Sequence, residues 1–156
     1  MTNNSSITSN FRLDSVSNIT GAGTFTGTTI IIDSNAYITL LSNITISPSS
    51  SFTINTNGIL DLNSFTFTIT SGTFVASAGS SVLNSGIFRT QGTVSMNIRG
   101  GSIFSAPLQI NTGTTTLIDQ NSPYIARIYG SLTTDNGATL SAELLYHLVL
   151  KLLELS

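Results

Sequence analysis

The chain has 156 residues, a length typical of one domain, and a composition that is unusual for an enzyme. Charged residues make up 8% of it, against about a quarter in ordinary soluble domains, and the net charge of −2 gives no electrostatic case for binding nucleic acid or an anionic membrane. The absence of cysteine excludes disulfides, thiolate metal sites and thiol nucleophiles.

Residues 1–23 do not follow the repeat described below, and we interpret them as an N-terminal cap or a degenerate first rung. The repeat would place Thr8 and Asn18 at positions where the next unit carries Ile30 and Leu40. Terminal repeats of stacked arrays are often atypical, because an open end exposes a sheet edge. The first ten residues, MTNNSSITSN, lack the basic and apolar regions of a secretion signal.

Residues 24–140 repeat with a fixed step of about 22 residues. Apolar residues recur in two columns, namely Ile30, Phe52, Phe74, Met96, Ile118 and Leu140 in the first and Ile38, Leu60, Val82 and Phe104 in the second. Between them lies a column of residues that tolerate a left-handed backbone, formed by Asn35, Asn57, Gly79 and Gly101. We interpret this column as a recurring corner.

Polar and apolar residues alternate around these columns, which is the period of a strand with one buried face. Each unit is too short to bury its apolar face alone, but stacked units bury a continuous column. The sequence therefore predicts an all-β fold, a single parallel β-solenoid with about 22 residues per rung.

Residues 141–156 are predicted to form a short apolar helix. Ser141 is a suitable N-cap, and the residues at heptad spacing are Leu145, Leu148, Leu152 and Leu155. Such a helix either caps the end of its own rod or docks on a partner subunit as an oligomerisation helix. No apolar run of the chain reaches the roughly 18 residues of a membrane span.

The segment GILDLNSFTFTITSGTFVASAGSSVLNSG, residues 58–86, consists of short strands rich in Thr, Ser and Val that end in Ser-Gly or Asn-Gly. It resembles the right-handed parallel β-helix repeats of bacterial surface proteins, in the style of autotransporter passengers and filamentous haemagglutinins, and also those of viral fibres. The resemblance covers residues 24–134 and implies an extracellular location or one on a cell or virion surface. It also implies a structural or adhesive role without cofactors.

Candidate catalytic residues are few. The fixed step places Asp33 three rungs from Arg99, about 14 Å, which is too far for acid–base cooperation. Asp61 stands equally far from Arg127. Asp119 lies one rung beyond Arg99 and could pair with it at the surface, a contact that would have no functional meaning. We therefore predict no catalytic, cofactor-binding or metal site.

The sequence favours a non-enzymatic adhesin-like or fibre module that associates with itself as a homo-oligomer or filament. A host-surface glycan or protein is a further partner, and Ile31 and Phe67 are expected to be apolar surface positions. One alternative is an ice-binding protein with a Ser/Thr-rich face, and a second is a carbohydrate-acting β-helix enzyme. The fixed step counts against ice binding, because it gives Ser51/Thr53 on one rung but Leu117/Asp119 on another.

Overall fold

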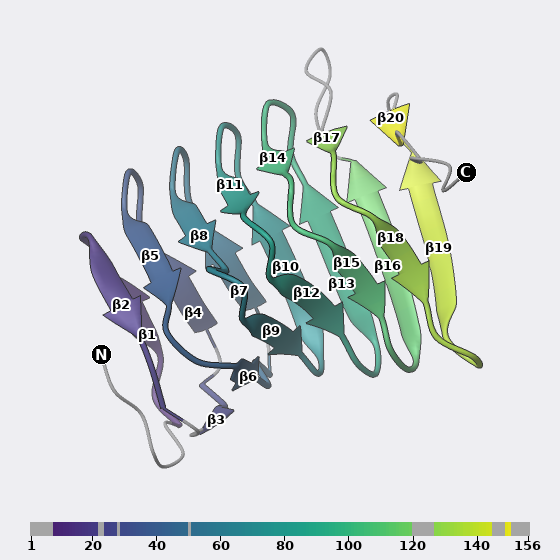
Figure 1. Cartoon of the computed structure of the whole chain (residues 1–156), viewed down its shortest axis with the longest axis horizontal. Coiled ribbons are helices and arrows are strands. Elements are labelled where there is room, and N and C mark those ends of the chain that lie inside the picture. The colour runs from purple at the N-terminus through teal and green to yellow at the C-terminus, as the bar shows by residue number, and fades with distance from the viewer. Residues whose placement is uncertain are drawn as a thin grey trace.

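The chain folds into a solenoid in which three parallel sheets extend along the length of the molecule and enclose its core (Figure 1). A computed structural model describes residues 8–21, 24–27, 29–49, 51–119, 127–144 and 149–150. Every regular element in these ranges is a β-strand. Each strand pairs with strands from the neighbouring turns, and one turn takes about 22 residues. The predicted parallel β-solenoid is therefore confirmed.

Each sheet collects one strand from every turn. Sheet 1 contains β1 (Phe11–Leu13), β4 (Thr29–Ile32), β7 (Ser51–Ile54), β10 (Gly72–Ala76), β13 (Val94–Ile98), β16 (Thr114–Asp119) and β19 (Thr139–Leu144). Sheet 2 contains β2 (Ser17–Ile19), β5 (Tyr37–Leu40), β8 (Ile59–Asp61), β11 (Ser81–Leu83), β14 (Ile103–Phe104), β17 (Arg127–Ile128) and β20 (Val149–Leu150). Sheet 3 contains β3 (Thr24–Phe25), β6 (Ile44–Ile46), β9 (Thr66–Ile69), β12 (Ile87–Thr90), β15 (Leu108–Ile110) and β18 (Leu132–Thr134).

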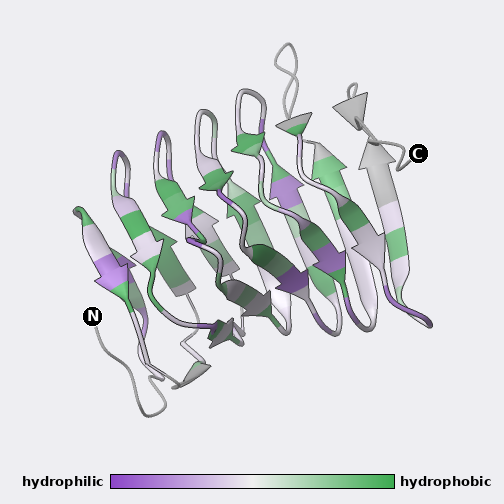
Figure 2. Cartoon of the chain, in the orientation of Figure 1, coloured by the Kyte–Doolittle hydropathy of each residue, from purple (hydrophilic) through white to green (hydrophobic). Residues whose placement is uncertain are grey.

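The core fills the space between the three sheets. Alternate residues of each strand point inward, so that apolar side chains stack rung upon rung. In the middle of the rod the stack is aromatic, and the Phe74 ring lies 5.6 Å from Phe52 and 5.0 Å from Phe88. Figure 2 shows apolar bands on the strands of all three sheets.

The corner between sheets 1 and 2 has the same design in four successive turns. Asn35, Asn57, Gly79 and Gly101 all have positive φ, between 57° and 79°. One residue after each of them, a backbone N–H closes the turn, as from Ala36 to the carbonyl of Asp33, at 3.1 Å. Asn and Gly adopt this left-handed conformation with little strain, which explains why they recur here.

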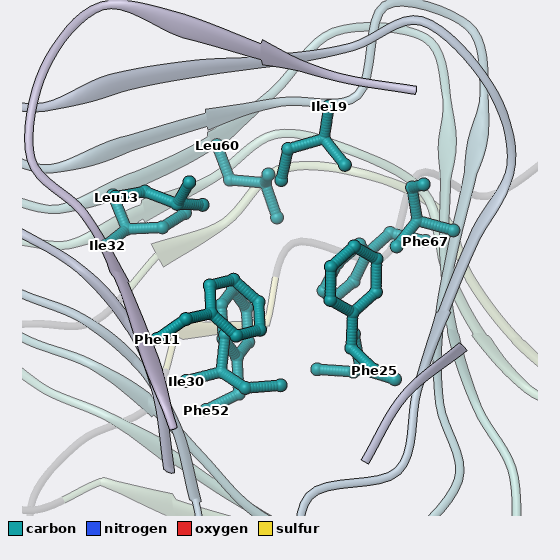
Figure 3. A pocket seen from close by; sticks show the side chains of 11 residues that line it. Phe11, Leu13, Ile19, Phe25, Ile30, Ile32, Phe52, Leu60 and Phe67 are labelled. Carbon is teal, nitrogen blue, oxygen red and sulfur yellow. The ribbon is translucent and has the colours of Figure 1, made fainter. Parts of the chain in front are cut away.

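The N-terminal segment forms a rung in its own right. Strands β1 and β2 pair with β4 and β5, and Phe11 pairs with Ile30, so that this rung is shorter than the fixed step. The fixed step therefore misplaces the apolar residues of this rung. A small cavity of about 10 Å³ lies beneath it, lined by Phe11, Phe25 and other apolar side chains of the first three rungs (Figure 3).

The predicted C-terminal helix does not begin at Ser141. Residues 141–144 belong instead to strand β19, where Ser141 pairs with Thr116, and Val149–Leu150 form strand β20. The backbone of residues 141–144 pairs with the exposed edge of β16 on the preceding rung. A helix at this position would leave that sheet edge unpaired. Leu145, Leu148, Leu152 and Leu155 lie outside the described residues.

Candidate functional surfaces

The two predicted apolar columns lie in the interior up to the fifth rung. Ile30, Phe52, Phe74 and Met96 follow one another along sheet 1, and each is at most 2% exposed. Ile38, Leu60, Val82 and Phe104 do the same along sheet 2.

The register of sheet 1 departs from the fixed step after Met96. Met96 pairs with Leu117, which is 2% exposed, whereas Ile118 pairs with Asn97 and points outward, half-buried. Leu140 pairs with Thr115 and packs partly buried against the core. The placement of Ile118 in the first column is therefore wrong, because this turn is one residue shorter than those before it.

Phe67 is a core residue rather than a surface residue. It is 2% exposed, and its ring lies 5.1 Å from Phe52 and 5.5 Å from Phe88. It belongs to sheet 3, where the number of residues between paired positions varies from turn to turn. The interval from Ile44 to its partner Phe67 is longer than the interval from Phe88 to its partner Leu108, so a fixed step does not detect these apolar columns. Ile31 does point outward, half-buried.

Sheet 1 presents hydroxyl groups on its outer face. With the observed register, one outward position is Ser or Thr in six successive rungs, which are Thr29, Ser51, Thr73, Ser95, Thr116 and Ser141. In the last three rungs the position two residues earlier is also a hydroxyl, which gives Thr93/Ser95, Thr114/Thr116 and Thr139/Ser141. We call these residues together the hydroxyl face.

The sequence contained a signal for this face that the fixed step concealed. The pattern Ser/Thr-x-Ser/Thr occurs at 93–95, 114–116 and 139–141, but the intervals between these segments differ from the fixed step. The fixed step made Leu117 and Asp119 outward residues and so argued against a regular array. The structure pairs Leu117 with Met96 and Asp119 with Ile98, and both Met96 and Ile98 are buried residues of β13.

Sheet 2 has a more apolar outer face. Ile103 in β14 is 43% exposed, and two residues that flank strands of this sheet are exposed as well, namely Val16 before β2 (80%) and Tyr129 after β17 (45%). Tyr37 stands on the same side and donates a hydrogen bond of 2.7 Å to Asp61. Large exposed apolar side chains on one face are typical of an interaction surface.

Asp61 is a carboxylate held at the edge of sheet 2 and is 8% exposed. Burial raises the pKa of this carboxyl, but hydrogen bonds from Asn84, Tyr37 and the backbone N–H of Asn63 favour the charged form and leave the pKa below its ordinary value. The same hydrogen bond to Asp61 raises the pKa of Tyr37. These contacts hold the chain where it leaves sheet 2 toward sheet 3, and they provide the Asp61 carboxylate with hydrogen-bond donors.

Sheet 3 carries a network of amide and charged side chains over its last three rungs. Arg89 donates to Gln109 at 2.9 Å, and Gln109 donates to Asp135 at 3.1 Å. Gln91 donates to Asn111 at 2.8 Å, and Asn111 donates to Asp135 at 2.5 Å. Hydrogen bonds from Asn111 and Gln109 lower the pKa of Asp135. Figure 2 shows the hydrophilic bands on β12 and β15.

Asp33 has an ionic partner that the fixed step did not predict. Asp33 forms a salt bridge with Arg12 on the preceding rung, and this interaction lowers the pKa of Asp33 and raises that of Arg12. A pairing of Asp119 with Arg99 lies outside what the structure describes, because the side chain of Asp119 is not among the described ones.

Among the described residues, no group of three or more His, Asp or Glu side chains could hold a metal ion, and no helix is long and apolar enough to cross a membrane. Comparison of the chain with family models, with curated proteins and with solved structures finds no match. The surfaces of the solenoid are therefore the basis for a functional proposal.

Proposed function

We propose that the protein is a non-enzymatic structural or adhesive rod, a module of a cell surface, virion surface or fibre that associates with further copies of itself. The observation that carries this proposal is the unbroken parallel pairing of three sheets from the first rung to the last described one. Stacked backbone hydrogen bonds make such a rod stiff, and they hold side chains in straight columns on separate faces.

The outer face of sheet 2 supports self-association. Ile103 lies on β14, the fifth of the seven strands, Tyr129 follows β17 on the next rung, and Val16 precedes β2 at the N-terminal end of the sheet. Asp61, a described carboxylate on this face, is buried and hydrogen-bonded, so it does not repel a second copy. Two rods that meet through the same face would form an isologous contact, which two-fold symmetry closes.

The outer face of sheet 3 supports a hydroxyl-rich partner such as a surface glycan. Arg89, Gln91 and Gln109 are each oriented by a side chain on the next rung, so they are held in place before a ligand arrives. Planar amide and guanidinium groups offer hydrogen bonds in fixed directions, which suits recognition of neutral hydroxyls.

The test is the association state of the purified chain, measured by light scattering and electron microscopy over a range of concentrations, together with binding to a panel of immobilised glycans. We expect oligomers or filaments, and we expect Ile103→Asp to shift them toward monomer because it places a charge in the contact. The matched control is Thr133→Asp, at an exposed position of sheet 3. A wild-type chain that stays monomeric at all concentrations and binds no glycan would refute the proposal.

A further inference from the structure

The hydroxyl face has a regular spacing in both directions. Successive rungs of a parallel sheet stand about 4.8 Å apart, and residues i and i+2 of one strand stand about 6.6 Å apart. In sheet 1 the rung partners Ser95, Thr116 and Ser141 are in direct register, as are Thr114 and Thr139. Oxygen atoms in hexagonal ice repeat at intervals slightly shorter than the first spacing and slightly longer than the second.

Four hydroxyls in the longer column of this face are available to water, whereas those of Thr116 and Ser141 lie 3.2 Å apart and form a hydrogen bond with each other. No hydrogen-bond partner is found, within the described part of the chain, for the side chains of Thr29, Ser51, Thr73 and Ser95. None of these oxygens is buried without a partner, so each is accessible to solvent. A hydroxyl donates one hydrogen bond and accepts two, and a row of them can therefore hold a row of waters in fixed positions.

The column beside the hydroxyls carries methyl groups. Outward positions next to Thr29, Ser51, Thr73 and Thr116 are occupied by Ile31, Thr53, Val75 and Ile118, all of them β-branched; Asn97 interrupts the column beside Ser95. β-Branched side chains are restricted at χ1, so these methyls are held in a fixed pattern. The strands Thr29–Ile32, Ser51–Ile54, Gly72–Ala76 and Val94–Ile98 carry no charged residue, whereas the end rungs do, since Arg12 pairs with Ile31 and Glu143 pairs with Ile118.

We propose that the hydroxyl face binds ice, with the ordered water lattice itself as the ligand. Hydroxyls spaced by the rungs anchor waters near lattice positions, and the neighbouring methyls, which make no competing hydrogen bonds, leave those waters bonded to one another. The other two faces lack rows of hydroxyls in register, because sheet 2 presents exposed apolar side chains such as Ile103 and sheet 3 presents the amide and charged side chains of Arg89, Gln91 and Gln109. This activity is separate from the role as an associating rod.

The experiment measures thermal hysteresis and inhibition of ice recrystallisation by the purified full-length chain, with an inert protein at the same concentration as reference. We expect faceted ice crystals and a measurable hysteresis for the wild type. Thr116→Lys should abolish most of the hysteresis. It places a long charged side chain in the middle rung of the three that carry two hydroxyls each, Thr93/Ser95, Thr114/Thr116 and Thr139/Ser141. The matched control, Thr45→Lys, substitutes an exposed threonine of sheet 3 and should leave the hysteresis unchanged.

We expect circular dichroism melts to show that both variants keep the fold, because each substitution is on the outer side of a strand. A wild-type chain without hysteresis or recrystallisation inhibition overturns the proposal. Equal losses in Thr116→Lys and Thr45→Lys, or no loss in Thr116→Lys, overturn the assignment to the hydroxyl face. None of these outcomes bears on the proposed self-association through sheet 2, because light scattering tests that proposal independently.

Discussion

Substitution of Phe74 tests whether the rod depends on its interior aromatic stack. The side chain is 0% exposed, and its ring lies between those of Phe52, Phe88 and Phe104, at centroid distances of 5.6, 5.0 and 6.4 Å. Phe74→Ala removes a fully buried ring and should lower the free energy of unfolding by about 3–5 kcal/mol. Domains of this size are stable by roughly 5–15 kcal/mol, so the variant should remain folded but melt early.

Phe74→Asp should be more severe. It creates the same loss of packing and in addition buries a carboxylate with no partner, which costs further free energy or forces the group to be protonated. We expect this variant to be unfolded at neutral pH. Thr73→Asp is the control, because Thr73 is the adjacent residue on the outer side of β10, and its substitution should change stability by about 1 kcal/mol or less.

Urea melts followed by circular dichroism give the midpoint and the slope for each variant. We expect a large difference in unfolding free energy between Phe74→Asp and Thr73→Asp, because the side chain of Phe74 points inward and that of Thr73 points outward. Similar destabilisation of Thr73→Asp and Phe74→Asp would contradict the inward placement of Phe74 and with it the register of sheet 1.

Two further predictions concern a carboxylate and a corner. Because the pKa of Asp61 is lowered in the folded chain, its contribution to stability is complete above the ordinary carboxyl pKa of about 3.9 and is lost as the pH falls through the lowered value. Asp61→Asn should therefore weaken the acid dependence of the melting temperature more than Asp33→Asn does, since Asp33 lies in an exposed ion pair. Gly113 and Gly137 both have positive φ but differ in the space around them. A Cβ at Gly113 would stand 2.3 Å from the carbonyl oxygen of Gly92, whereas a Cβ at Gly137 would have no atom of the described residues within 4 Å. Gly137→Ala should cost about 1–2 kcal/mol of unfolding free energy from its backbone conformation, and Gly113→Ala should cost about 1–3 kcal/mol more in urea melts; equal costs would contradict the close stacking of Gly113 on Gly92.

The fold class could be predicted from the sequence because one phase of the repeat is constant over four rungs. From Ile30 to Met96 the turns keep the same length, so a fixed step finds the inward positions of sheets 1 and 2. The regular corner contributed as well, because its left-handed residue restricts the choice to Asn or Gly.

Sheet 3 and the hydroxyl face could not be found with a fixed step. The step from Ile44 to Phe67 is longer than the fixed one, whereas the step from Phe88 to Leu108 is shorter. The loss of length before Leu108 carries over into the next strand of sheet 1, where Met96 meets Leu117. A shift of one residue exchanges inward and outward positions, so the array that starts with Thr93/Ser95 disappeared from the fixed alignment.

The connections between the sheets vary in length along the solenoid, and the sequence is periodic only over the turns in which the connections keep their length. In the four turns whose corners contain Asn35, Asn57, Gly79 and Gly101, the connection between sheets 1 and 2 is a tight turn closed by one backbone hydrogen bond, as between Gly58 and Asn55 at 2.8 Å. In the next turn the same connection runs from Asp119 to Arg127, the pairing partners of Ile98 and Ile103, and is three residues longer. The connections into and out of sheet 3 are less uniform, so residues can be gained or lost there while the paired strands keep their register. The parallel pairing of the strands sets the alignment of side chains across rungs, and the number of residues between the strands does not. The columns of the outer faces are therefore preserved through turns of unequal length, and they are visible only when the strands are aligned by their pairing.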